Sequence, residues 1–389
     1  MNMTVRQLSF HARRDFFFDA ARAATGLVDV GADDFAEGFD LFLKCLDEEA
    51  ILSPAGELAT ASFIEMFLVS RLYSEEGWKR RPEALARPIQ APVIITGIVR
   101  SGTTALHKLM SMDPQFQGIE HWLTRAPQPR PPHALWPENP NYREACRTLA
   151  GMIATSAELE TDHMMAADEV EESLFLLTQS FKNNMLTSQW NIPTYEAWYL
   201  NQDETDSYQR FAKNLQLIGA NEPEKRWLLK NPTDLLALDA VLNVFPDAMI
   251  IQTHRDPVQS IPSIANLIAA ARRLFEGPDS SPHIVGRREC GFWALALQRA
   301  TQARTRAKQP VFDLEFKDFV QDQLGAVKAI YAHFGLILTH DVEQAMQAWL
   351  AAHPRQSTGM QRFSPEDFGL SADELRRTYA SYRAARGYE

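Results

Sequence analysis

A short run of cationic, hydroxyl-bearing and flexible residues early in the chain has the composition of an anion-binding loop. The run consists of Arg100, Ser101, Gly102, Thr103 and Thr104. It follows the apolar, β-branched segment 92–98, which is typical of a buried strand, and it leads into segment 103–112, which has helical character. Such a strand–loop–helix unit exposes unpaired backbone N–H groups and hydroxyls at the positive end of a helix. These residues therefore predict a site for a phosphate or a similar anion.

The glycine spacing in this loop leaves two interpretations open. Gly97 and Gly102 are spaced as in a nucleotide-binding P-loop, but Thr103 stands where the lysine of such a loop would follow, and the nearest cation is Arg100. A strand-to-helix turn capped by Ser101, without any ligand, is an equally good interpretation of these residues alone. A decision between the two needs a second site.

Two further strand ends carry residues suited to an anionic ligand. Lys230 follows the strand candidate 226–229, and Arg255 lies two residues beyond the strand candidate 248–253. Ser263 lies eight residues beyond Arg255, where a hydroxyl on the next helix and a guanidinium can hold one phosphate. Since the carboxyl ends of parallel strands meet at one edge of a sheet, these residues are expected to lie near the first loop.

The elements that must position these residues alternate between strand and helix. Strands are predicted at 92–98, 226–229, 248–253 and 310–314, and helices at 103–112, 235–244, 259–274 and 324–334. This alternation predicts an α/β fold with a central, mainly parallel sheet flanked by helices. Residues 1–90 are predicted to form an N-terminal helical extension, and residues 91–389 the domain that carries the site.

The N-terminal extension is expected to contain helices at 35–46 and 58–72. Within the second domain, segment 114–225 is interpreted as an insertion of helices and a lid. Its first part, 114–140, is so rich in proline that neither a helix nor a strand interior is expected there. A polar loop at 353–368 is predicted to precede a last short helix at 371–379.

Charge and cysteine content limit the classes of partner and compartment. The chain of 389 residues has 39 Lys and Arg against 50 Asp and Glu, a formal charge of −11, so nucleic acid and anionic membranes are not expected as partners. Cys45, Cys146 and Cys290 form no CxxC or Cys/His cluster, which argues against disulfides and structural zinc. No apolar run approaches the ~20 residues of a membrane span or the pattern of a secretory leader. A cytoplasmic protein without an integral membrane segment is predicted; the oligomeric state stays open, with a homodimer as one option.

Together, the motifs resemble the nucleotide-binding motifs of sulfotransferases that use 3′-phosphoadenosine 5′-phosphosulfate (PAPS). The run 100–104 resembles the loop that holds the 5′-phosphosulfate in that family. Segment 253–257, Thr-His-Arg-Asp-Pro, together with Ser263 is similar to the family's 3′-phosphate site, and Lys230 stands where a family lysine reaches the transferring group. The resemblance extends over about residues 91–368 and is nearest to the bacterial and mycobacterial branch.

The resemblance implies both a fold and an activity. It implies a sulfotransferase fold of the P-loop nucleotide-kinase type, and an enzyme that transfers a sulfonate group from PAPS to a hydroxyl of a small or lipid-like acceptor and releases 3′,5′-ADP. Such a transfer needs in-line attack and cations around the transferring oxygens, for which Arg100 and Lys230 are suitable residues. The resemblance also implies that no metal is required.

Three further residues are expected at the nucleotide through this resemblance. Phe316 replaces a tyrosine that stacks near the adenine in the family, and it keeps the stacking face. Arg355 and Arg362 lie in the polar loop that takes the place of the family's C-terminal 3′-phosphate loop. Ordinary surface arginines are an equally good interpretation of these two.

The general base that deprotonates the acceptor has several candidates. Asn231 stands where animal cytosolic members carry a histidine base, so another residue has to serve. His163 is the first candidate because its segment resembles one typical of the bacterial branch. His121 with Glu120 is the second, because tyrosylprotein sulfotransferases carry a catalytic glutamate about as far beyond the loop arginine, and Glu172 is the third. A surface histidine and an acidic helix start are the alternative interpretations.

Aromatic residues near the middle of the chain indicate an apolar acceptor, such as a phenol, sterol or lipid alcohol. Trp190 and Trp198 are expected to line its pocket, whereas Phe175 and Phe181 are expected in the core. Two other function classes remain. A P-loop kinase would need a loop lysine and a magnesium-binding carboxylate, and a non-catalytic nucleotide-binding module would keep the loop without a base.

Overall fold

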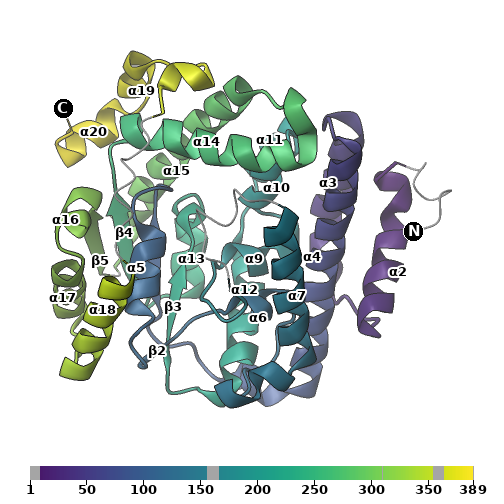
Figure 1. The fold of residues 1–389 in the computed structure, drawn as a ribbon, viewed down its shortest axis with the longest axis horizontal. Coiled ribbons are helices and arrows are strands. Elements are labelled where there is room, and N and C mark those ends of the chain that lie inside the picture. The colour runs from purple at the N-terminus through teal and green to yellow at the C-terminus, as the bar shows by residue number, and fades with distance from the viewer. Residues whose placement is uncertain (1–8, 156–165, 309, 354–362, 389) are drawn as a thin grey trace.

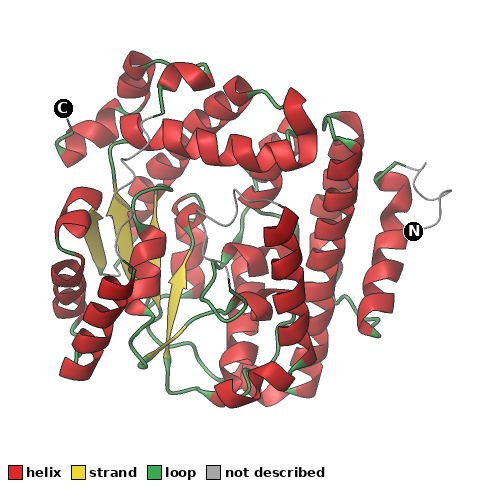
Figure 2. Ribbon diagram, viewed as in Figure 1, coloured by secondary structure: helices red, strands yellow, loops and turns green. Residues whose placement is uncertain are grey.

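Five parallel strands form one sheet in the structure, a computed structural model that describes residues 9–155, 166–308, 310–353 and 363–388. The strand order is β2-β3-β1-β4-β5. The strands are β1 (Val93–Gly97), β2 (Phe116–Gln117), β3 (Arg226–Lys230), β4 (Met249–His254) and β5 (Val311–Glu315). Figure 2 shows the strands in yellow among the red helices. This arrangement confirms the predicted α/β fold with a parallel sheet flanked by helices.

Helices make up most of the rest of the described chain, and Figure 1 shows them by label. The first group is α2 (Arg14–Thr25), α3 (Ala36–Glu48), α4 (Pro54–Arg80), α5 (Thr103–Met110), α6 (His121–Arg125), α7 (Pro140–Thr155), α9 (Leu174–Leu177), α10 (Asn184–Gln189), α11 (Pro193–Tyr199) and α12 (Thr205–Ile218). The second group is α13 (Leu238–Val244), α14 (Pro257–Glu276), α15 (Pro282–Arg306), α16 (Phe316–Gln321), α17 (Gln323–Phe334), α18 (His340–Ala352), α19 (Ala372–Thr378) and α20 (Ala380–Arg386).

Both faces of the sheet carry apolar side chains, which point alternately to one face and to the other along each strand. Val93 and Ile95 of β1 and Ile251 of β4 pack in a core shared with α5, α17 and α18. Ile94 and Ile250 point the opposite way, into a larger core shared with α13 and α15. The continuous apolar runs in the sequence are therefore the signature of strands buried on both faces.

The four predicted strands are confirmed, each to within one residue at either end. The prediction that segment 114–140 holds neither a helix nor a strand interior was wrong, because it contains β2, α6 and the 3₁₀ helix His133–Glu138. These elements are two to six residues long, and the 3₁₀ helix includes Pro137. Proline limits the length of elements here and does not prevent them.

The N-terminal helices share a core with the rest of the molecule. Phe39 of α3 and Phe67 of α4 pack against Phe181, which lies far along the chain. At Gly56, α4 approaches α14 so closely that a Cβ would lie 1.8 Å from the backbone oxygen of Phe275. The predicted helices at 35–46 and 58–72 are found as α3 and the longer α4, whereas a domain boundary near residue 90 stays a prediction.

The C-terminal region of the described chain ends in two short helices. Most of the predicted polar loop at 353–368 lies outside the described residues, and its last part, Pro365–Phe368, is a 3₁₀ helix. The predicted last helix at 371–379 is found as α19, and α20 follows it. Among the described residues, no helix combines the length and the apolar character needed to cross a membrane.

Candidate active site

The loops after β1 and β4 lie side by side because these two strands are neighbours. Gly97 at the end of β1 is in register with Thr253 of β4. Near these strand ends, the hydroxyl oxygens of Ser101 and Thr253 are 2.5 Å apart, and Nη1 of Arg255 donates a hydrogen bond of 2.8 Å to the backbone oxygen of Arg100. The two motifs that the sequence predicts for one ligand therefore meet at the same edge of the sheet.

The loop after β1 has a backbone that ordinary side chains rarely adopt. Gly97 and Gly102 have φ angles of 144° and 92°, and Arg100 has a φ of 70° despite its side chain. A Cβ on Gly97 would lie 2.2 Å from the hydroxyl of Thr253, which explains why glycine is needed there. Left-handed backbone at a non-glycine residue is strained and concentrates at functional loops. This curvature brings Thr103, the first residue of α5, to the turn.

Lys230 brings a third strand to the same place. It is the last residue of β3 and is paired with Ile95 on β1, and only 3% of it is exposed. Its Nζ lies 3.3 Å from the hydroxyl of Thr104 and donates to a carboxylate oxygen of Glu172. The loop, the strand lysine and one predicted base candidate are thus in one cluster.

A histidine–carboxylate pair lies beside this cluster. Nδ1 of His121 is 3.4 Å from Oε2 of Glu171. Burial raises the pKa of Glu171, but the hydrogen bond with His121 and the charge of Lys230 outweigh it, and the pKa lies below its ordinary value. Burial, together with the charge of Lys230, lowers the pKa of His107 on α5 to about 3, so His107 is neutral. Glu171 and His107 were not among the predicted site residues, although Glu171 belongs to the acidic run that ends at Glu172.

Glu120 makes its contacts away from Lys230. Its carboxylate accepts a hydrogen bond of 3.0 Å from Nε of Arg130, and Arg130 also contacts Glu222 and Gln117. Burial raises the pKa of Glu120, and the charge of Arg130 opposes this. This network ties the loop after β2 to the start of β3.

Two of the residues predicted at the 3′-phosphate and the adenine, Arg255 and Phe316, lie against each other. The guanidinium carbon of Arg255 lies 4.5 Å from the centroid of the Phe316 ring. Phe316, the first residue of α16, also flanks Gly102, where a Cβ would lie 3.3 Å from its ring. Ser263 is half-buried on α14, two turns beyond the helix start, which Asp256 caps by accepting a hydrogen bond from the Val258 N–H.

Three of the predicted site residues are not placed. His163, Arg355 and Arg362 lie outside the described residues. The prediction for Trp190 was wrong: its ring is fully buried, packs against Phe42 and Phe275, and its Nε1 donates to the hydroxyl of Thr60. It belongs to the core rather than to an acceptor pocket.

Two buried carboxyl groups lie behind the Lys230 strand end. Asp234 accepts hydrogen bonds of 2.6 Å from the hydroxyl of Tyr208 and the amide of Asn231, and burial raises its pKa to about 7. Burial likewise raises the pKa of Glu204, which accepts a hydrogen bond from Tyr199, to about 8. Sequence patterns did not single out either residue, because their burial depends on contacts that are distant along the chain.

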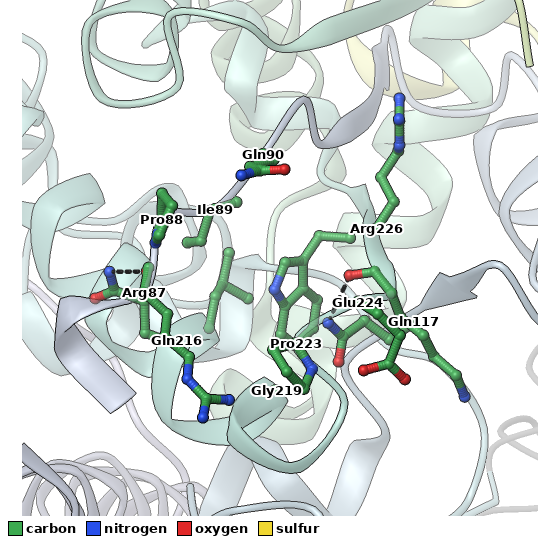
Figure 3. A pocket seen from close by; sticks show the side chains of 13 residues that line it. Arg87, Pro88, Ile89, Gln90, Gln117, Gln216, Gly219, Pro223, Glu224 and Arg226 are labelled. Atoms are coloured by element: carbon green, nitrogen blue, oxygen red, sulfur yellow. Dashed lines mark hydrogen bonds between the residues drawn. The ribbon is translucent and has the colours of Figure 1, made fainter. Parts of the chain in front are cut away.

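A separate pocket of about 110 Å³ lies at the other end of β3 (Figure 3). Arg226, Gln117 and Arg87 are among the residues that line it. Arg226 is the first residue of β3 and Lys230 the last, so roughly 13 Å of strand separates this pocket from the cluster. The pocket is therefore not part of the candidate active site. Within the described ranges, no group of three His, Cys, Asp or Glu side chains could hold a metal ion.

Comparison with known proteins identifies the family. Residues 92–341 match the model of the sulfotransferase family. The omega-hydroxy-beta-dihydromenaquinone-9 sulfotransferases Stf3 of Mycobacterium bovis and Mycobacterium tuberculosis are each 24% identical to this chain over 292 residues, which are 71% of this chain and 70% of the relative.

Solved structures give the same result for nearly the whole chain. The crystal structure of sulfotransferase STF1 from Mycobacterium tuberculosis is 36% identical, with a TM-score of 0.86 over 94% of this chain and 98% of that chain. Sulfotransferase STF9 from Mycobacterium avium is 26% identical, with a TM-score of 0.88 over 95% and 96% of the two chains. This chain therefore belongs to the sulfotransferase family, has its P-loop-like fold, and is similar to its mycobacterial members.

Proposed function

We propose that this sulfotransferase uses PAPS as its donor and transfers the sulfonate group to a hydroxyl of a small or lipid-like acceptor. The observation that carries the proposal is the hydrogen bond from Arg255 to the backbone of Arg100. It joins the loop suited to a 5′-phosphosulfate to the arginine suited to a 3′-phosphate. One adenosine with groups at both positions can then span the two loops.

The 5′ end of the donor is assigned to the loop after β1. The backbone N–H groups from Gly102 onward and the exposed hydroxyl of Thr104 would hold the phosphosulfate at the positive end of α5. The hydroxyl of Ser101 contacts Ile98 and Thr253, so its role is to hold the loop in shape. Arg100 would add positive charge to the rim.

The 3′ end of the donor is assigned to Arg255 and Ser263, with Phe316 beside the adenine. A guanidinium and a hydroxyl can both donate to a phosphate, and the aromatic ring offers a stacking face. We also assign Arg355 and Arg362 to this end on the strength of their place in the chain. This donor set contains no metal ligand, and metal-independent turnover in the presence of EDTA is the expected outcome.

The transfer itself requires a cation at the sulfonate and a base at the acceptor. When bound, the donor supplies an activated sulfonate whose S–O bond to the 5′-phosphate breaks as the acceptor oxygen bonds to sulfur. Lys230 would neutralise the negative charge that grows on the sulfonate and the leaving phosphate. Glu172, which contacts Lys230, would take the proton of the acceptor hydroxyl.

His121 is the alternative base among the described residues. Its pairing with Glu171 would orient the ring, as carboxylates do for catalytic histidines. His163 remains a further candidate from the sequence. Turnover of the variants Glu172→Gln, His121→Asn and His163→Ala distinguishes the three candidates.

The acceptor is proposed to be a lipid-like alcohol. The relatives named Stf3 are sulfotransferases of an omega-hydroxylated dihydromenaquinone, which is a lipid-like molecule. We further propose that the protein acts in the cytoplasm, that nucleic acid is not a partner, and that a homodimer is the form to test first by sedimentation.

Ligand-induced stabilisation tests the donor assignment. We expect 3′,5′-ADP without metal to raise the melting temperature, because a ligand at one hundred times its Kd stabilises a protein by about 2.7 kcal/mol. Stabilisation by ATP with magnesium and not by 3′,5′-ADP would instead favour a P-loop kinase. Transfer of labelled sulfonate from PAPS to a panel of lipid alcohols tests the reaction, and binding without transfer to any acceptor would leave a nucleotide-binding module.

A further inference from the structure

Side chains of the C-terminal helix α20 contact His254 and Asp256, the two sequence neighbours of Arg255. Figure 1 shows α20 near β4 and β5. The C-terminal clamp is defined here as Tyr382, Arg383, Arg386 and Tyr388. Its side chains reach two short segments that are more than sixty residues away along the chain, at the ends of β4 and β5.

The first half of the clamp holds both sequence neighbours of Arg255. The hydroxyl of Tyr382 lies 2.7 Å from Nδ1 of His254, whose Nε2 lies 2.7 Å from Asp313. Arg383 binds the Asp256 carboxylate through two hydrogen bonds of 3.0 and 3.1 Å. Paired, charge-assisted hydrogen bonds of this kind fix direction as well as distance.

The second half of the clamp holds the residue before Phe316. Arg386 donates to Oε1 of Glu315 through Nε, at 2.8 Å, and through Nη2. The hydroxyl of Tyr388 donates to the other carboxylate oxygen, Oε2, at 2.6 Å. Glu315 ends β5 and Phe316 begins α16. The contact therefore fixes the backbone that carries the Phe316 ring, which lies against Arg255.

We propose that the C-terminal clamp is a positioning element for the 3′-phosphate and adenine end of the donor. The proposal rests on the proposed function, because it takes Arg255 and Phe316 as nucleotide-binding residues. None of the clamp residues needs to touch the nucleotide. With His254 and Asp256 held, Arg255 keeps only the freedom of its own side chain, and less conformational entropy is lost when a phosphate orders it.

The clamp should therefore affect ligands with a 3′-phosphate selectively. Arg383→Ala removes the bidentate contact with Asp256 and is expected to weaken 3′,5′-ADP binding by about tenfold, the loss of one well-placed interaction. Binding of 5′-AMP, which lacks the 3′-phosphate, should change much less. Calorimetric titration of both ligands at one pH and one salt concentration measures the ratio of the affinity for 3′,5′-ADP to the affinity for 5′-AMP.

Further variants separate positioning from loss of folding. Tyr382→Phe deletes one hydroxyl on a half-buried ring and should lower the same ratio by a smaller factor without a large fall in melting temperature. Arg383→Lys should restore part of the ratio. Arg376→Ala on the neighbouring α19 removes an exposed ion pair with Asp373 and should leave both affinities unchanged, which makes it the matched control. Arg255→Ala should give the largest loss of 3′,5′-ADP affinity and is the reference for the other variants.

The outcomes distinguish the clamp from the function on which it rests. If the unaltered protein does not prefer 3′,5′-ADP to 5′-AMP, the 3′-phosphate assignment fails before the clamp is tested. If Arg255→Ala loses the preference while Arg383→Ala and Tyr382→Phe keep it, the clamp proposal is overturned. Equal losses for both ligands, accompanied by a lower melting temperature, would also overturn it, because they indicate general support of the fold.

Discussion

The ammonium group of Lys230 is buried, so protein groups rather than water have to balance its charge. Glu172 provides that balance, and Thr104 adds a hydroxyl. A sulfonate held beside Lys230 would compete with Glu172 for the same ammonium. Donor binding would then release the carboxylate from its partner, and a released carboxylate is a better proton acceptor. We propose that the residue pair would in this way link the arrival of the donor to activation of the acceptor.

This role of Glu172 predicts a selective loss of turnover. Glu172→Gln keeps the size of the side chain and removes its basicity, so kcat should fall by roughly 10²–10⁴. The affinity for 3′,5′-ADP should stay within a few-fold. Single-turnover transfer from PAPS, measured beside ligand titration, tests both expectations. Retained turnover in this variant, together with its loss in His121→Asn or His163→Ala, would assign the base to that histidine.

The buried carboxyl of Glu204 predicts an unusual dependence of stability on pH. Its folded-state pKa of about 8 lies above the ordinary value of 4.5, so the folded protein binds a proton that the unfolded chain has released between these values. The contribution of Glu204 to the free energy of unfolding is therefore fully present below pH ~4.5. It declines as the pH rises towards 8, by up to ~1.4 kcal/mol per pH unit.

Glu204→Gln removes this titration and keeps the hydrogen bond with Tyr199. The variant should gain stability relative to the unaltered protein as the pH rises from 5 to 8. Denaturant unfolding at several pH values measures the difference. A constant difference between the two proteins over this range would show that Glu204 titrates normally, and Glu196→Gln, at a half-buried position, is the comparison.

At the scale of elements, close approach between helices depends on single glycines. Gly56 lies in the first turn of α4, where Phe275 of α14 leaves no space for a Cβ. The same turn is capped by Ser53, whose hydroxyl accepts from the Gly56 N–H and also contacts Phe275. The start of α4 is thus fixed by a cap and by a contact that only glycine permits.

Gly56→Ala should force α4 and α14 apart and lower the free energy of unfolding by roughly 1–3 kcal/mol, the range for overpacking with a backbone shift. Gly291→Ala in α15 is the matched control, because a Cβ there meets no atom within 4 Å and alanine favours a helix by up to ~1 kcal/mol. Chemical denaturation of both variants provides the measurement. Equal free energies of unfolding for the two variants would mean that α4 can shift away from α14 without loss of stability.

The strands could be predicted from the sequence because β-branched apolar runs bounded by polar loop residues are a local signal. β2 could not, since its two residues are too few for a pattern and its pairing depends on β3. That the loop at 100–104 meets Lys230 and Arg255 could also be predicted, because all of them follow strands whose carboxyl ends share one edge of the sheet. The partners Glu171, Asp234 and Tyr382 could not, because their contacts join segments up to 128 residues apart, and periodicity carries no information at that distance.

At the scale of the whole molecule, the N-terminal helices and the sheet domain share one apolar core. Phe39, Phe42 and Phe67 are fully buried in it, and Arg71 on α4 donates to the backbone oxygens of Val30 and Gln179. Burial of three such rings contributes about 5–9 kcal/mol, which is comparable to the net stability of a domain. We therefore propose that residues 1–90 extend the family domain without forming an independent unit.

This proposal predicts a single cooperative unfolding transition for the intact chain. A protein that begins at residue 91 should be unfolded or aggregated, because its half of the shared core would face water. Calorimetry of the intact chain, and circular dichroism with size-exclusion chromatography of the shortened one, provide the measurements. A shortened protein that folds and binds 3′,5′-ADP would establish two separate domains.

The hydroxyl contact between Ser101 and Thr253 ties the ends of two adjacent strands, whose separation is set by the backbone at about 4.8 Å. Rotation of side chains does not alter this strand spacing, and we propose that it limits the distance between the two ends of the donor site. A regioisomer such as adenosine 2′,5′-bisphosphate has the same charge and mass as the 3′,5′ compound but a different reach between its phosphates. Its affinity should be lower because the distance between its phosphates does not match the site. Changes to the adenine that keep this distance should weaken binding less.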